Sequence, residues 1–133
     1  TIALEIFRCA DEIQSDSEGY GLAPVERGLE LAQRLGDRGA TATFLAYAAG
    51  WLLRTGDVAA ARDTTLEALD QLLEIADDDA VYELRVRQCA TNAISLTAMA
   101  GDVERAIELL AGLAEVIDDA TADQLRRSLE GVR

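Results

Sequence analysis

Apolar residues recur at helical spacing along the chain, and their pattern predicts seven helices separated by short polar breaks. The first helix is expected over residues 2–14, followed by a polar, glycine-containing loop over residues 15–23. Pro24 fits the first turn of the second helix, where its missing N–H costs nothing, and Gly36 fits the end of that helix. We find no alternating apolar and polar run of the kind that a strand requires.

The third predicted helix, residues 40–55, is apolar on nearly all sides, which is typical of a helix buried between neighbours. Gly56 is expected to end it. Asp57 follows as an N-cap, because its carboxylate can accept hydrogen bonds from the free amides of the fourth helix. The fourth helix is predicted to reach residue 76.

Three consecutive aspartates, Asp77 to Asp79, stand before the fifth helix, which is predicted to reach residue 100. We interpret them as a cap and a solvated segment, because they lack the ligand spacing of a calcium loop. The sixth helix is predicted to extend to residue 117. Thr121-Ala122-Asp123-Gln124 has the form of a capping box and is expected to open a last helix over residues 121–131.

Two segments of the chain carry the same pattern, an apolar run, a Gly-Asp break and a run that contains alanine. They are Arg54-Thr55-Gly56-Asp57-Val58-Ala59-Ala60-Ala61 and Met99-Ala100-Gly101-Asp102-Val103-Glu104-Arg105-Ala106, and their glycines stand 45 positions apart. Internal repetition of this length indicates one helical hairpin per period. We therefore expect a single domain, residues 1–133, made of hairpins over residues 2–36, 40–76 and 79–117 and a C-terminal capping helix.

These segments resemble the tetratricopeptide repeat (TPR), whose second helix opens with Gly-Asp, a hydrophobic residue and an alanine three positions further on. Gly56-Asp57-Val58 with Ala61, and Gly101-Asp102-Val103 with Ala106, match this pattern. Ala68-Leu69 matches a later pair of the family, which appears reversed as Leu113-Ala114 in the second unit. The period also exceeds the family's usual length of about 34 residues. The resemblance implies an all-α fold, a right-handed TPR-like superhelix of antiparallel helical hairpins.

The resemblance further implies that the first helix of each hairpin lines a concave face, where the family binds an extended peptide or a partner helix. The candidates for this face are Thr43, Ala46, Tyr47, Gly50, Leu53 and Arg54 on the third helix, and Gln88, Thr91, Asn92, Ser95 and Met99 on the fifth. Asn92 falls where family members often hold the backbone of a ligand. Tyr47 has a second interpretation, since an aromatic residue on a buried helix also packs between repeats.

Two residue types that often act in catalysis, histidine and lysine, are missing from this chain. It contains no histidine, and all twelve of its basic residues are arginine. The commonest general base and the phosphate-binding lysine are therefore absent, and we expect no enzymatic activity. Cys9 and Cys89 have no metal-ligand or redox spacing, so we expect buried thiols, no metal site and no cofactor.

The net charge of −13 excludes nucleic acid as the expected partner, because nucleic-acid-binding proteins neutralise phosphates with basic side chains. Anionic membranes are disfavoured for the same reason, and we find no secretory signal and no apolar stretch of membrane length. We therefore expect a cytoplasmic protein that binds another protein or a peptide.

An alternative function is also open. One segment resembles the sequence that connects the repeats of large bacterial regulators. It is Leu31-Ala32-Gln33-Arg34-Leu35-Gly36-Asp37-Arg38. The chain would then be a helical sensor segment of a larger signalling or transcription regulator. Because the chain begins with Thr1, we expect a piece of a longer protein. We also expect a bare N-terminal end to contact a second copy or the rest of that protein.

Overall fold

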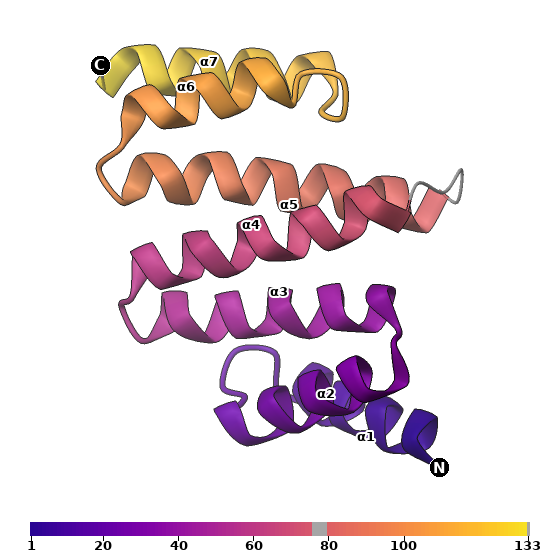
Figure 1. Cartoon of the computed structure of the whole chain (residues 1–133). Coiled ribbons are helices and arrows are strands. Elements are labelled where there is room, and N and C mark those ends of the chain that lie inside the picture. Colours follow the sequence, from indigo (N-terminus) through magenta and orange to yellow (C-terminus); the bar gives the residue numbers. More distant parts are fainter. Residues whose placement is uncertain (76–79, 133) are drawn as a thin grey trace.

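The chain folds into a stack of helices in the computed structural model, which describes residues 1–75 and 80–132 (Figure 1). The helices are α1 (Ile2–Ser15), α2 (Leu22–Leu35), α3 (Arg38–Arg54), α4 (Val58–Ile75), α5 (Ala80–Met99), α6 (Val103–Gly112) and α7 (Asp119–Val132). The two described ranges contain no strand. The predicted all-α class is therefore confirmed.

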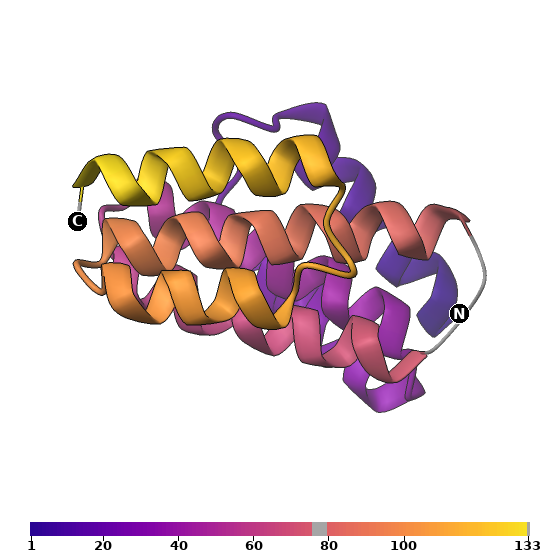
Figure 2. The same ribbon diagram turned by 90° about the horizontal axis from the view of Figure 1, so that it is seen from above.

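Each helix packs against the next one in the chain. In Figure 1, α3, α4 and α5 form successive layers, while α1 and α2 cross the stack at its N-terminal end. At the other end α5, α6 and α7 contact one another, and the view from above in Figure 2 shows α7 running alongside α5. This arrangement is compatible with a helical repeat.

The Gly-Asp break forms the same tight junction wherever it occurs. Gly36, Gly56 and Gly101 adopt φ values of 72°, 91° and 95°, in the left-handed region that favours glycine. The aspartate that follows each glycine accepts a hydrogen bond from a backbone N–H three residues further on, at 3.0–3.1 Å. The cap predicted at Asp57 is confirmed. The junction at Gly36 joins α2 to α3, between two hairpins, so this motif marks a helix junction and not one fixed place in a repeat.

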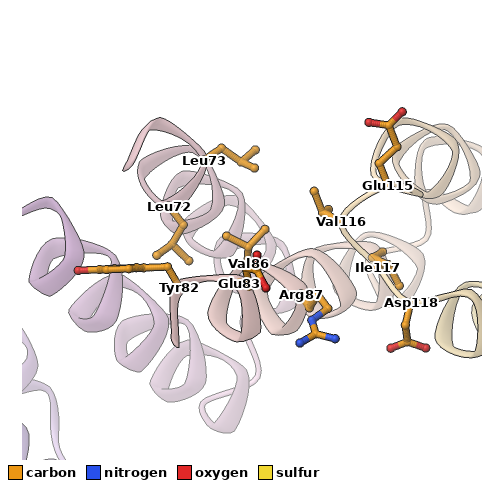
Figure 3. Close-up of a pocket in the computed structure, with 10 residues that line it drawn as sticks. All are labelled: Leu72, Leu73, Tyr82, Glu83, Val86, Arg87, Glu115, Val116, Ile117 and Asp118. Atoms are coloured by element: carbon orange, nitrogen blue, oxygen red, sulfur yellow. The ribbon is translucent and has the colours of Figure 1, made fainter. Parts of the chain in front are cut away.

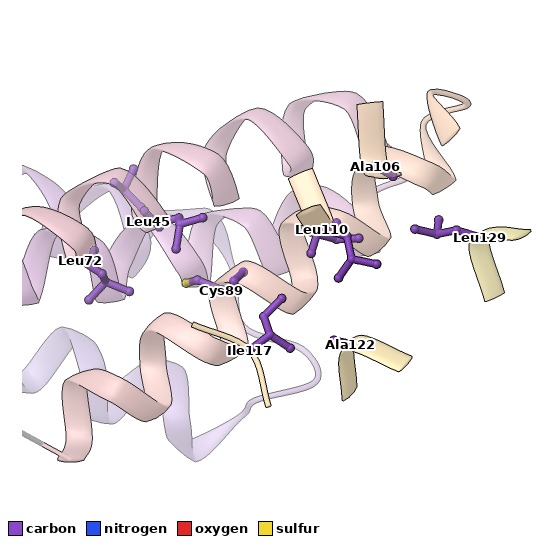
Figure 4. Packing of buried hydrophobic residues seen from close by; sticks show 13 residues of the cluster. Leu45, Leu72, Cys89, Ala106, Leu110, Ile117, Ala122 and Leu129 are labelled. Carbon is purple, nitrogen blue, oxygen red and sulfur yellow. The ribbon is translucent and has the colours of Figure 1, made fainter. Parts of the chain in front are cut away.

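The core is built largely from alanine and leucine. Its main cluster joins α3 through α7 and includes Leu45, Leu72, Cys89 and Leu110 (Figure 4). A second cluster, formed by Ile13, Val25, Ala32 and Phe44, joins α1 and α2 to α3. Ala61 and Ala106, the matched alanines of the two Gly-Asp segments, are both fully buried. Small side chains at these positions let neighbouring helices approach closely.

One predicted helix end and one predicted cap near the C-terminus are wrong. The sixth helix ends at Gly112 and not at residue 117, and the next residues form a turn. Ile117 is nevertheless buried, which explains why the apolar pattern continued through it. The last helix begins at Asp119, and the cap comes from Asp118, which accepts a hydrogen bond from the Thr121 N–H at 2.8 Å. The other described helix ends lie within two residues of their predicted positions. The cap predicted at Asp77 to Asp79 lies outside the described residues.

Candidate binding face on α5

Two adjoining hollows lie along α5. The first, of about 250 Å³, lies between α3 and α5 and is lined by Thr43, Ala46, Tyr47, Arg85, Gln88 and Asn92, among others. The second, of about 450 Å³, lies between α5 and the start of α7, and its lining includes Gln88, Thr91, Asn92, Asp118 and Thr121. Gln88 and Asn92 belong to both hollows. We call the two hollows together the α5 face.

The two shared amides form the ridge between the hollows. Gln88 and Asn92 stand four residues apart and therefore on the same side of α5. Both are exposed, and neither side chain forms a hydrogen bond to another residue of the described chain. Each amide offers two N–H donors and one carbonyl acceptor. These groups match the alternating N–H and C=O groups of an extended peptide.

The first hollow combines a polar wall with an apolar floor. Thr43 donates to the carbonyl of Gly39 at 2.9 Å and accepts from the Arg85 guanidinium at 2.7 Å, so its hydroxyl is already engaged. The floor includes Leu72 and Cys89, which are buried. Burial raises the pKa of the Cys89 thiol, and the nearby Arg85 opposes this only in part. The thiol is therefore protonated at neutral pH and is a poor nucleophile.

The second hollow contains a fixed carboxylate. Asp118 accepts from the Thr121 backbone N–H at 2.8 Å and from the Thr121 hydroxyl at 2.9 Å. These two hydrogen bonds, in that order, lower the pKa of Asp118, and the charge of Arg87 lowers it further. Asp118 is therefore ionised at neutral pH and acts here as a helix cap.

Two of the predicted residues lie away from these hollows, beneath the α1–α2 loop, residues 16–21. Arg54 donates to the carbonyl oxygens of Glu18 and Tyr20, and its guanidinium carbon lies 4.3 Å from the centre of the Tyr20 ring. A Cβ on Gly50 would come within 2.6 Å of the Tyr20 hydroxyl oxygen. The loop therefore covers this end of α3. Arg54 holds it through hydrogen bonds, and Gly50 leaves room for the Tyr20 hydroxyl.

Tyr20 is the anchor of that loop, and the sequence pattern did not identify it. Its hydroxyl donates to the backbone carbonyl of Tyr47 at 2.7 Å. Burial raises the pKa of this phenol, although Arg54 opposes the shift, so the hydroxyl keeps the proton that it donates. Tyr20 is the single aromatic residue in a polar loop, and this feature of the sequence could have indicated that it anchors the loop.

Tyr47 packs against neighbouring aromatic rings and also lines the first hollow. Its ring packs edge to face against Tyr20 and Phe44, with centroids 6.1 and 5.7 Å apart. Its hydroxyl accepts a hydrogen bond from the Gln14 side chain at 2.9 Å, and the residue also lines the first hollow. Tyr47 can therefore pack against other rings and still line the first hollow.

The remaining predicted residues contribute to neither hollow. Leu53 and Met99 are exposed, and Ser95 is half-buried on α5. Six of the predicted residues are thus brought together on the α5 face: Thr43, Ala46, Tyr47, Gln88, Thr91 and Asn92. The sequence missed Arg85, Arg87, Asp118 and Thr121. Arg85 precedes Gln88 by three residues on one helix and could have been found by that spacing.

Residues 1–75 and 80–132 contain no group of three or more cysteine or acidic side chains close enough to hold a metal ion. Over the same ranges, no helix has both the length and the hydropathy that a membrane crossing requires. Comparisons of the chain with models of protein families, with curated proteins and with solved structures find no match.

Proposed function

We propose that the chain is a non-catalytic, TPR-like interaction module that binds an extended peptide or a partner helix on the α5 face. The observation that carries this proposal is the pair of exposed amides, Gln88 and Asn92, on the ridge between two hollows. A peptide backbone crossing that ridge would exchange hydrogen bonds with both amides, and its side chains would enter the hollows on either side.

The electrostatics of the chain favour a protein or peptide partner over nucleic acid or an anionic membrane, because a net charge of −13 repels phosphate. The two free cysteines, Cys9 and Cys89, fit a reducing compartment such as the cytoplasm. Among the described side chains, the carboxylate with a clearly shifted pKa is Asp118, and the shift is downward. That direction does not suit a general acid at neutral pH.

The α5 face can be tested with a displayed library of random peptides. We expect enrichment of a family of sequences, whose affinities are then measured by fluorescence anisotropy with synthetic peptides. Ala46 is exposed and lines the first hollow, so Ala46→Arg should fill that hollow and weaken binding by about tenfold or more. Ala59→Arg is the matched control, because Ala59 is exposed on α4 and lines neither hollow. An arginine at Gly50 is less suitable, since it would displace Tyr20.

Amide NMR provides a second and independent readout, because Gln88, Cys89 and Asn92 all line the first hollow. A peptide bound on the α5 face should shift the amide signals of these three residues. The proposal is wrong if the enriched peptides bind the Ala46→Arg and Ala59→Arg proteins equally, or if they leave these signals unchanged.

A second candidate function, the helical sensor segment of a larger bacterial regulator, is favoured by one observation. Arg87 and Asp118 line the second hollow of the α5 face and also a separate cavity beside α4. A ligand in that cavity would contact side chains that a peptide on the α5 face also contacts. Binding of the two would then be coupled, and a change in peptide affinity on addition of the ligand would support this function.

A further inference from the structure

A cavity of about 460 Å³ opens between the last turns of α4, the first turns of α5 and residues 115–118. Figure 3 shows Leu73, Val86 and Val116 facing one another across it, from three different segments of the chain. Leu73 is 44% exposed, although leucine is apolar. The cavity therefore has an apolar interior that is open to solvent.

This cavity exists because α6 is short. In the matched hairpin α4 has 18 residues, whereas α6 has 10 and ends at Gly112. The chain then turns, and Ile117 is buried against the core while Val116 faces the cavity. Had α6 continued as α4 does, residues 113–117 would not form this turn and this wall of the cavity would be absent.

The charged residues around the cavity are unbalanced. Three carboxylates, Glu83, Glu115 and Asp118, accompany one guanidinium, that of Arg87. Within the described chain, none of these four side chains takes part in an ion pair. Asp118 accepts hydrogen bonds from Thr121 through both of its oxygens but keeps its charge. The single guanidinium offsets one of the three carboxylates, so the lining carries an excess of two negative charges. A cation is therefore attracted to this cavity and an anion is repelled.

We propose that this cavity binds a small organic ammonium compound, with its apolar body against Leu73, Val86 and Val116 and its protonated amine beside Glu83. The volume lies within the range of small-molecule sites, and an apolar lining with few polar groups is their usual character. The apolar body covers surface that is otherwise exposed to water. The carboxylates around the cavity favour a ligand with a positive charge. This proposal does not rest on the binding of a peptide on the α5 face, although Arg87 and Asp118 line both this cavity and the second hollow.

The test is a titration followed by amide NMR, with three probes that carry a phenyl ring on a short chain. Phenethylamine is cationic at neutral pH, phenethyl alcohol is neutral and hydrocinnamate is anionic. We expect saturable shifts at Leu73, Val86 and Val116 with phenethylamine, weaker binding of the alcohol and the weakest binding of hydrocinnamate. The proposal is overturned if hydrocinnamate binds as well as phenethylamine, or if phenethylamine gives no saturable shift at these residues.

Two pairs of variants locate the site. Glu83→Gln should weaken phenethylamine binding by about two- to fivefold, the range of a solvated ion pair, and leave the alcohol unaffected. Glu67→Gln, at an exposed position on α4 outside the cavity, should leave both probes unaffected. Leu73→Arg should abolish the shifts, and the control Ala59→Arg should retain them. Equal affinity in Glu83→Gln and Glu67→Gln would assign the selectivity to the overall charge of the chain and overturn the site.

Discussion

The second helices of the hairpins α3–α4 and α5–α6 begin alike and end differently. Both have a Gly-Asp junction with a left-handed glycine, a capping aspartate and a fully buried alanine four residues after that aspartate. Beyond that point α4 continues to Ile75, with Ala68 and Leu69 buried, whereas α6 stops at Gly112. The junction is a local motif, but the length of the second helix depends on the residues further along.

The difference coincides with the departure from the TPR pattern. Where the first hairpin has Ala68-Leu69, the second has Leu113-Ala114 in reversed order, and there Ala114 is exposed and Leu113 half-buried. Gly112 stands at the place that Glu67 occupies in the first hairpin, and glycine is the weaker helix former. The shorter helix opens the cavity beside α4, so the two hairpins differ in what they can bind.

The largest expected effect tests whether the two hairpins pack alike. Ala61→Glu and Ala106→Glu each bury a carboxylate at a position that is 0% exposed. Each should lower the free energy of unfolding by at least about 3 kcal/mol, because an unpaired buried charge loses its hydration. Urea denaturation followed by circular dichroism measures this loss, with Ala59→Glu as the exposed control. Stability like that of the parent protein in either variant would refute the equivalence of the two positions.

A smaller effect tests the junctions themselves. Gly56→Ala and Gly101→Ala should each lower the free energy of unfolding by about 1–2 kcal/mol, because an L side chain disfavours the positive φ. The space around both positions is open, so backbone strain is the only cost. Thermal unfolding of the two variants should show similar losses. A large loss in one and none in the other would show that the junctions are not equivalent.

The next effect concerns the end of α6. Gly112→Ala should raise the free energy of unfolding by about 0.5–1 kcal/mol, because alanine is the better helix former and a Cβ there meets no other atom. The reciprocal change in α4, Glu67→Gly, should lower it by a similar amount. Chemical denaturation of both proteins measures the two changes. A loss of stability in Gly112→Ala would mean that the turn after α6 requires glycine.

The smallest effect is a dependence on pH at the start of α7. Because the pKa of Asp118 is lowered in the folded state, its ionised form stabilises the fold above the ordinary value of 3.8. This contribution is lost as the pH falls through the lowered pKa. Asp118→Asn keeps a capping side chain but does not titrate, so its stability should fall less steeply in acid. Denaturation at a series of pH values compares the two proteins, and identical profiles would contradict the assignment.

Features that depend on residues close together in the chain could be predicted from the sequence. The helices, the junction at Gly56 and the cap at Asp57 follow from spacing and side-chain chemistry within one or two turns. The same local reasoning failed at residues 113–117, because Ile117 keeps helical spacing but reaches the core from a turn. It also placed the last cap at Thr121, although Asp118 is equally suited and lies nearer to the helix start.

Which of the predicted residues meet depends on how the helices pack. Gln88 and Asn92 share a ridge because α5 passes between α3 and the start of α7, and the spacing within one helix cannot reveal that. Gly50 and Arg54 stand at positions of α3 that the repeat pattern assigns to the binding face. Tyr20, which comes from another segment, covers them. The physical reason is the same in each case. Helix formation is governed by near neighbours, whereas a hollow is bounded by side chains that the chain brings together from distant positions.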